Sequence, residues 1–299
     1  MSHPVLISII VPTYNRAHLI SPTIESILAQ TYTNFELIIV DDGSTDDTEA
    51  VIQKYLSEKV FYFKKNNEER AAARNYGTKK AKGDYVNWFD SDDMMSPDNL
   101  QEAANNIAKN GMVEVIIQGF QYIDGAGKLI HESNFDRPVH LDMYIANQVA
   151  NSPVIVRRDI ALANPFNEDR ELSGSEDYEL WLRLASKYPF FTSEKRTVTY
   201  ILHDERSTVV MSDPDQFIRR YTKFIHYTTS DPGVVAFLGK NKNYFVMKTY
   251  LLHAVDLVLN NCKLLGCKYL LKAFFTSPKV IFERGFYAFI KHFLRHIIS

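Results

Sequence analysis

A short acidic run, Asp90-Ser91-Asp92-Asp93, is the part of this sequence whose residue types point most directly to chemistry. It follows Asp84–Phe89, an apolar segment typical of a buried strand. Carboxylates at the end of a strand can hold a hard cation such as Mg²⁺ or Mn²⁺, together with the phosphates of a bound substrate. The alternative is a solvated acidic loop that caps a helix starting near Ser96-Pro97-Asp98.

The elements around this run alternate between strands and helices. Apolar runs predict strands over residues 5–11, 35–40, 60–63 and 85–89, and the segments between them predict helices over about 18–30, 47–57 and 69–81. This order predicts an α/β fold with a mainly parallel sheet and helices on both faces. Ligands bind beyond the carboxyl ends of such strands, so we expect residues 12–15, 41–44 and 90–93 to converge there.

The rest of the chain is less regular and then becomes helical. Strands are expected near residues 113–120, 153–156 and 197–202, and a helix over 176–187. Further helices are expected near 215–228, 241–260, 265–275 and 285–298. The pattern predicts a catalytic domain over residues 1–212 and a helical C-terminal region over residues 213–299.

Composition excludes several classes of protein. The 299 residues are 45% hydrophobic and 23% charged, which is typical of a globular protein. A formal net charge of -2 argues against nucleic-acid binding. The spacing of Cys262 and Cys267 fits neither a zinc knuckle nor a CxxC redox pair, which suits a reducing cytoplasm. We also see no secretory signal at the N-terminus and no apolar stretch of roughly 20 residues that could span a membrane.

Four ordered segments resemble the sequence blocks of glycosyltransferase family 2. They are Ile7–Arg16, Glu36–Asp46, Ala73–Tyr85 and the Asp90–Asp93 run, which is similar to the family's DxD motif. The resemblance extends over roughly residues 5–205. It implies a Rossmann-like GT-A fold and the transfer of a sugar from a nucleotide diphosphate donor with inversion at the anomeric carbon.

The same resemblance assigns the residues that bind the nucleotide sugar. The first loop is expected to cradle uridine, Asp41 to accept from uracil or ribose, and Asp90 to bind ribose. An arginine among alanines, Arg74, needs an anionic or planar partner, and a base or a phosphate is expected. Arg70 is a second candidate or a surface charge, and Glu68-Glu69 replaces a glycine pair that is usual in the family. The expected binding residues are Pro12, Thr13, Tyr14, Asn15, Asp41, Arg74, Asp90 and Ser91.

The implied cofactor is a divalent metal, Mn²⁺ or Mg²⁺. Asp92 is the expected ligand and Asp93 is its closest rival, a choice that one sequence leaves open. His203 is a third candidate, although the family's Tyr-Arg-x-His pattern is here Tyr200-Ile201-Leu202-His203 and lacks the arginine. Such an ion stabilises the negative charge on the leaving nucleoside diphosphate.

Glu176-Asp177 at the start of a predicted helix resembles the acidic motif of the family. Inverting transfer needs one base to take the proton of the acceptor hydroxyl. We expect Asp177 to be this base, with Glu176 as the alternative or as a group that orients the acceptor. Both carboxylates could instead only cap the helix.

Basic residues alternate with leucine and phenylalanine over residues 262–299. This pattern suits helices lying on an anionic membrane, and the alternative is a helical subdomain whose basic residues face solvent. The family resemblance implies a hexosyltransferase that uses a UDP-sugar and a saccharide or lipid-linked acceptor in surface polysaccharide synthesis. Together with the C-terminal pattern, it predicts that the enzyme acts at the inner face of the cell membrane.

Two other functions are alternatives to this prediction. A sugar nucleotidyltransferase would need a glycine-rich phosphate loop after its first strand, where this chain has Pro12–Asn15. A non-catalytic sugar-nucleotide-binding or membrane assembly protein would bind the donor without turnover.

Overall fold

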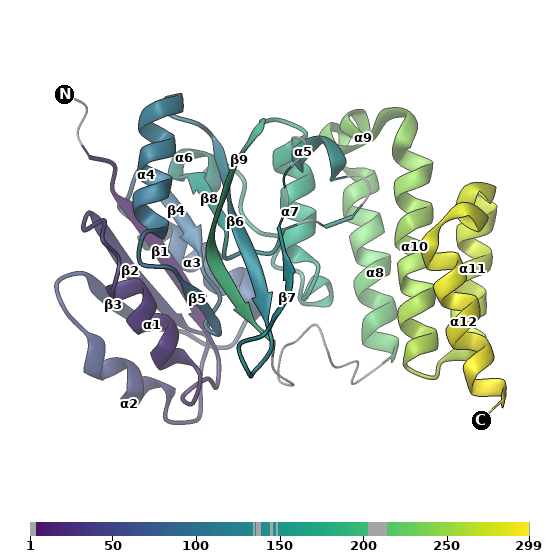
Figure 1. Ribbon diagram of the computed structural model, residues 1–299, viewed down its shortest axis with the longest axis horizontal. Coiled ribbons are helices and arrows are strands. Elements are labelled where there is room, and N and C mark those ends of the chain that lie inside the picture. The colour runs from purple at the N-terminus through teal and green to yellow at the C-terminus, as the bar shows by residue number, and fades with distance from the viewer. Residues whose placement is uncertain are drawn as a thin grey trace.

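The computed structural model describes residues 4–133, 135, 139–143, 146–147, 149–202 and 214–298. Its sheet and the helices around the sheet form one half of the molecule, and the C-terminal helices form the other half (Figure 1). This arrangement is the predicted α/β fold with a helical C-terminal region. The predicted boundary between residues 212 and 213 lies outside the described residues and stays a prediction.

The described strands form a single nine-stranded sheet in the order β3-β2-β1-β4-β8-β6-β9-β5, with β7 paired to β6. Strands β1 to β4 pair in parallel, and β6 pairs in parallel with β9, whereas β8 runs antiparallel to both β4 and β6. The predicted mainly parallel sheet is therefore confirmed. The strands are β1 Ile7–Thr13, β2 Phe35–Asp41, β3 Val60–Lys64, β4 Tyr85–Trp88, β5 Asp93–Met95, β6 Val115–Ile123, β7 Leu129–Glu132, β8 Val154–Arg157 and β9 Phe190–Ile201.

Strand β1 continues through Pro12 to Thr13, beyond the predicted end at residue 11. The strand pairs with β2 as far as Thr13, but its pairing with β4 stops at Ile10. Proline has no N–H to donate, and it is tolerated here because one side of β1 is already unpaired at this point. The strand thus carries Pro12 and Thr13 directly to the edge where a ligand can bind.

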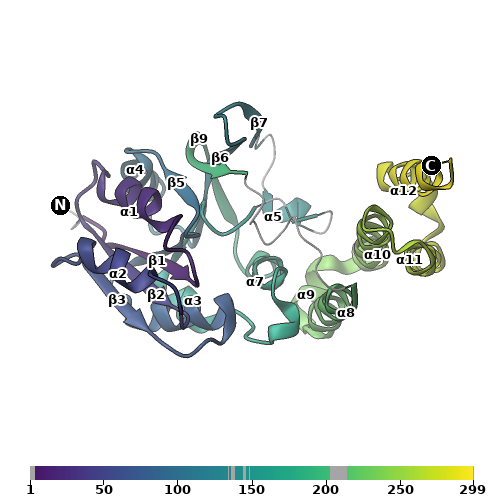
Figure 2. The same ribbon diagram turned by 90° about the horizontal axis from the view of Figure 1, so that it is seen from below.

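Helices cover both faces of the sheet, with α1 and α4 on one face and α3 on the other (Figure 2). Helix α3 lies so close to β1 that a Cβ atom on Gly77 would be 2.4 Å from Ile10 Cγ2, so only glycine fits there. The α-helices are α1 Ile20–Leu28, α2 Thr48–Ile52, α3 Glu69–Lys80, α4 Asn99–Asn110, α5 Val139–Asp142, α6 Arg158–Ala163, α7 Glu176–Ala185, α8 Pro214–Ser230, α9 Pro232–Leu238, α10 Lys242–Leu259, α11 Lys263–Thr276 and α12 Arg284–Ile298.

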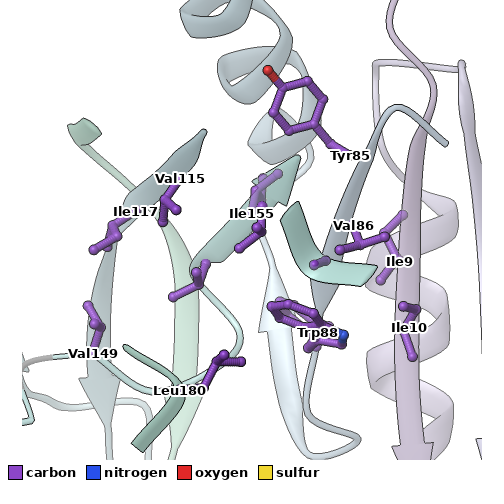
Figure 3. Close-up of a cluster of buried hydrophobic side chains, with 14 of the residues drawn as sticks. Ile9, Ile10, Tyr85, Val86, Trp88, Val115, Ile117, Val149, Ile155 and Leu180 are labelled. Atoms are coloured by element: carbon purple, nitrogen blue, oxygen red, sulfur yellow. The ribbon is translucent and has the colours of Figure 1, made fainter. Parts of the chain in front are cut away.

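Trp88 on β4 connects the sheet to helices α3 and α7. Its ring lies 4.8 Å from that of Phe166 and 6.2 Å from that of Trp181, and its Nε1 donates to Thr78 at 2.9 Å. Figure 3 shows Trp88 in the buried cluster that also holds Leu180 of α7. Because large buried rings fix the position of α7, the start of that helix is held at the edge of the sheet.

The C-terminal helices pack in order outward from α7 (Figure 1). Phe224 of α8 and Phe245 of α10 belong to the same buried cluster as the sheet residues. Helices α11 and α12 pack on α10 through two smaller clusters, one that includes Ala254 and Phe289 and one that includes Leu251 and Ala273. These helices therefore form a packed subdomain, and among the described residues none is long and apolar enough to cross a membrane.

Candidate active site

A cavity of about 460 Å³ lies at the carboxyl ends of β1 and β4 and reaches the start of α7. Two of the three polar segments expected to converge there, 12–15 and 90–93, contribute several residues, and 41–44 contributes one. Its wall contains Pro12, Thr13, Tyr14, Arg16, Asp42, Asn67, Glu69, Arg70, Arg74, Asp90, Ser91, Asp92, Tyr122, Ala150, Asn151, Gly174, Glu176, Asp177 and Leu202. We refer to it as the donor cavity.

Arg74 joins two carboxylates that line the donor cavity. It is 1% exposed, donating from Nη1 to Glu176 Oε1 at 2.8 Å and from Nη2 to Asp90 Oδ1 at 2.7 Å. Its guanidinium carbon also lies 5.3 Å from the ring centre of Phe166. The anionic partner that the sequence required is thus a pair of carboxylates, one at the end of β4 and one at the start of α7.

Glu176 and Asp177 begin α7 side by side but differ in ionisation. Burial alone would raise the pKa of Glu176, but the charges of Arg70 and Arg74 outweigh it and hold that pKa below its ordinary value. Burial, aided by the negative charge of Glu176, raises the pKa of Asp177 to about 7. A carboxyl group with this pKa is suited to exchange a proton near neutral pH.

The segment after β2 presents Asp42, rather than the expected Asp41, to the cavity. Asp41 is fully buried, and accepts from Ser44 N and the Tyr62 hydroxyl at 2.7 Å each. Asp42 lines the cavity and accepts from Lys65 Nζ at 2.8 Å. Asn15 is not among the cavity's lining residues; its Oδ1 accepts from Thr45 N at 2.8 Å and so ties the first two loops together.

The four residues of the acidic run divide between the cavity and the core. Asp90, Ser91 and Asp92 line the donor cavity. Asp93 is fully buried at the start of β5, where its Oδ2 accepts from Ser152 Oγ at 2.5 Å. Within the described residues, no group of three or more His, Cys, Asp and Glu side chains could by itself hold a metal ion. His203 lies outside the described residues.

Glu69 lines the cavity in a strained conformation. Its φ angle is 76°, in the left-handed region that favours glycine, and its Oε2 accepts from Ser173 Oγ at 3.1 Å. Glu69 stands where the family usually has one of two glycines. It therefore places a carboxylate on the cavity wall, where glycine would leave space.

Sequence reasoning missed several lining residues, among them Asn67, Tyr122 and Asn151. Tyr122 comes from β6 and Asn151 from the loop before β8, both distant in sequence from the motifs. Neither stands in a recognisable pattern, so only the packing of the sheet reveals them.

The sheet, its helical layers and this acidic cavity are those of a GT-A glycosyltransferase. The chain belongs to glycosyltransferase family 2, because the family model described as "Glycosyl transferase family 2" matches residues 8–161. An uncharacterised glycosyltransferase of Rickettsia typhi is 27% identical over 91% of this chain and 91% of its own length. Another, from Haemophilus influenzae, is 30% identical over 68% of this chain and 71% of its own length.

Some relatives are much longer than this chain. Chondroitin synthase of Escherichia coli is 28% identical over 70% of the chain, which spans only 30% of that protein. The chain likewise spans 34% to 39% of three rickettsial glycosyltransferases.

Solved structures show the same fold at low sequence identity. A fragment of S. aureus TarS in complex with UDP-GlcNAc has a TM-score of 0.70 at 20% identity and covers 96% of this chain and 89% of its own. Mannosyltransferase PcManGT from Pyrobaculum calidifontis, in complex with GDP-Man and Mn²⁺, has a TM-score of 0.57 at 16% identity, covering 97% and 86%.

Proposed function

We propose that this glycosyltransferase is a metal-dependent, inverting hexosyltransferase that uses a UDP-sugar. The observation that carries the proposal is the position of Asp177, whose pKa is raised to about 7, in the same cavity as Asp92 and the loop after β1. A base, a metal-binding edge and a nucleotide pocket are the three parts that such a transfer requires.

The loop after β1 supports the assignment of the nucleotide. Tyr14 lines the cavity and is 47% exposed, so its ring is accessible for stacking on a base. The TarS fragment is known in complexes with UDP-GlcNAc and with UDP, which favours uridine for this chain. The complex of PcManGT with GDP-Man favours a hexose.

The residues at the cavity edge fit a divalent cation. Mg²⁺ and Mn²⁺ bind through one or two carboxylates and complete their shells with water and substrate phosphates. Asp92 offers such a carboxylate, with Asp90 beside it for the ribose, and His203 is a further candidate, whereas Asp93 accepts from Ser152 in the core. When bound, the cation neutralises charge on the diphosphate.

Asp177 takes the proton of the acceptor hydroxyl as that hydroxyl attacks the anomeric carbon. Arg74 fixes Glu176 and Asp90 on either side, so the base and the metal-binding edge keep a constant separation. Glu176 remains ionised beside Arg74 and orients the acceptor or supports the base electrostatically.

We further propose that the protein acts at the cytoplasmic face of the cell membrane, in surface polysaccharide synthesis. Leu264, Phe275 and Phe282 are 91%, 81% and 79% exposed, and Lys268, Lys279 and Arg284 are exposed near them. Exposed apolar and basic side chains together suit an anionic lipid surface. The similarity to chondroitin synthase supports a saccharide or lipid-linked acceptor.

Calorimetric titration with UDP, with and without Mn²⁺, tests the proposal on wild type and Asp92→Ala. We expect tight binding that requires Mn²⁺ and is lost in the variant. No UDP binding to either protein would contradict the choice of nucleotide. Metal-dependent binding without release of UDP from any UDP-hexose, with or without acceptors, would favour the non-catalytic alternative.

A further inference from the structure

A second cavity, of about 370 Å³, lies between the start of α7 and helices α8 and α10. Its volume falls in the range of small-molecule binding sites. Gly174 and Asp177 line this cavity and the donor cavity alike, so the two adjoin at the candidate base. Figure 2 shows α7 between the sheet and α8, which places the second cavity on the C-terminal side of the molecule.

Gly174 lies where the two cavities meet. This residue has a φ of +90°, and a Cβ atom there would lie 2.6 Å from Arg220 Nη1 of α8. From the second cavity, Asn147 Nδ2 donates to Asp177 Oδ2 at 3.3 Å. Asp177 is therefore within reach of a molecule that occupies the second cavity.

The walls of the second cavity are mainly apolar. Four aromatic and three larger aliphatic side chains line it: Tyr178, Tyr221, Phe224, Phe245, Leu251, Leu252 and Val255. The rings of Tyr178 and Phe224 are stacked on each other, with centres 5.0 Å apart, so these faces are already occupied.

Several polar side chains of this cavity are already bonded within the protein, among them Asn147 to Asp177 and Tyr221 to Asp256. The Thr249 hydroxyl donates to the carbonyl oxygen of Phe245 at 3.0 Å, and Lys248 Nζ lies 2.9 Å from Glu283 Oε2. Sugar hydroxyls buried without partners would cost free energy, whereas an apolar chain gains about 25 cal/mol for each Å² removed from water. The cavity therefore suits a hydrocarbon chain better than a saccharide.

We propose that the second cavity binds the apolar chain of a glycolipid acceptor, so that the sugar attached to that chain meets the donor at Asp177. This inference rests on the proposed transfer reaction and selects the lipid-linked acceptor over a free saccharide. The cavity extends to Leu252 and to Gly285 at the start of α12. That end adjoins the helices that carry the exposed Leu264 and Phe275, where a chain anchored in a bilayer would enter.

The test uses n-decyl maltoside below its micelle concentration, with maltose as the probe that lacks a chain. Leu252 lines the cavity and is 54% exposed, so Leu252→Asn removes apolar wall without disturbing the core. Leu129→Asn on β7 is the matched control, since Leu129 is 48% exposed and lies outside both the cavity and the C-terminal helices. Calorimetry should show that wild type binds decyl maltoside at least about tenfold more tightly than maltose, because a buried chain contributes about 0.8 kcal/mol per methylene. Leu252→Asn should weaken this binding about tenfold, and Leu129→Asn should leave it unchanged.

Equal affinity for maltose would overturn the inference in favour of a saccharide site. An unchanged affinity in Leu252→Asn, or an equal loss in both variants, would place the chain elsewhere on the surface and overturn it as well. UDP with Mn²⁺ is titrated into the same samples. Retained UDP binding without chain binding contradicts only this inference, whereas chain binding without UDP binding contradicts the proposed function and keeps the cavity as a lipid site.

Discussion

Arg74 and Glu176, which are 102 positions apart in the sequence, form a buried ion pair with 2.8 Å between Nη1 and Oε1. The same guanidinium binds Asp90 at the end of β4. One side chain of α3 thereby joins the carboxyl end of β4 to the start of α7. Arg74 and Glu176 both line the donor cavity.

Replacing Arg74 by methionine should destabilise the protein strongly. The substitution removes the ion-pair partner of the Glu176 carboxylate, which is only 3% exposed and is then left with the charge of Arg70. Breaking one side of a buried ion pair costs about 3–5 kcal/mol. Urea unfolding at pH 7 should show a loss of this size in the free energy of unfolding.

The double variant Arg74→Met/Glu176→Gln is the control for this prediction. It removes the unpaired charge as well as its partner, so most of the lost stability should return. If Arg74→Met lowers the free energy of unfolding by less than about 1 kcal/mol, the ion pair does not stabilise the fold.

The sequence predicts most of the sheet because its strands are apolar and short. Residues 35–40 and 60–63 match β2 and β3 to within one residue. The first and third loops converge as expected because parallel strands end at the same edge of a sheet. The strand predicted near 197–202 matches only the second half of β9. The strand begins at Phe190, and its first half includes charged residues that hide the apolar pattern.

Side-chain direction at the strand ends could not be predicted. Successive residues of a strand point to opposite faces. If the predicted site residue is wrong by one position, the chosen carboxylate lies in the core and its neighbour lines the cavity. This explains why Asp42 lines the cavity and Asp41 does not. The pairing of Arg74 with Glu176 depends on the packing of α3 beside α7, and no local pattern encodes it.

The acceptor kcat/KM of the enzyme should rise with pH and level off above about 7. Asp177 acts as a base only when it has lost its proton, and burial raises its pKa to about 7. Below that pH the ionised fraction, and with it the rate, should fall about tenfold per pH unit. Steady-state kinetics between pH 5 and 9 measure the profile.

Asp177→Asn provides the control for the pH profile. It cannot accept a proton, so the rate should fall by at least about 10²-fold while Mn²⁺-dependent UDP binding persists. A wild-type profile that is flat across pH 7 would mean that another group is the base.

Asp92 and Asp93 should respond differently to the same change. Asp92→Asn should weaken Mn²⁺-dependent UDP binding at least about tenfold, because Asp92 lines the donor cavity. Asp93→Asn should keep that binding but lower stability by about 1–3 kcal/mol, because its buried carboxylate accepts from Ser152. A folded Asp93→Asn protein that has lost its metal dependence would reverse this assignment.

Glycine should replace Glu69 without loss of stability. The positive φ of 76° costs a non-glycine residue roughly 1–3 kcal/mol, which Glu69→Gly recovers against the loss of its contact with Ser173. Glu69→Val should lower the free energy of unfolding by more than about 1 kcal/mol, since a branched residue is strained there. Equal stability of the two variants by urea unfolding would show that the backbone at residue 69 is free to change.

The exposed side chains of α11 should govern binding to lipid. Phe275→Asp removes an apolar side chain that is 81% exposed and adds a negative charge beside basic neighbours. Burying a phenylalanine contributes about 1.5–3 kcal/mol, so binding to vesicles of phosphatidylglycerol and phosphatidylcholine should weaken at least about tenfold in sedimentation assays. Leu129→Asp is the matched control, because Leu129 of β7 is 48% exposed but lies outside the C-terminal helices.

Wild-type binding to the vesicles should also fall as salt rises from 0.05 to 0.5 M, since salt screens basic residues from anionic lipid. If wild type does not sediment with the vesicles, or if both variants weaken equally, the apolar surface of α11 has a different partner.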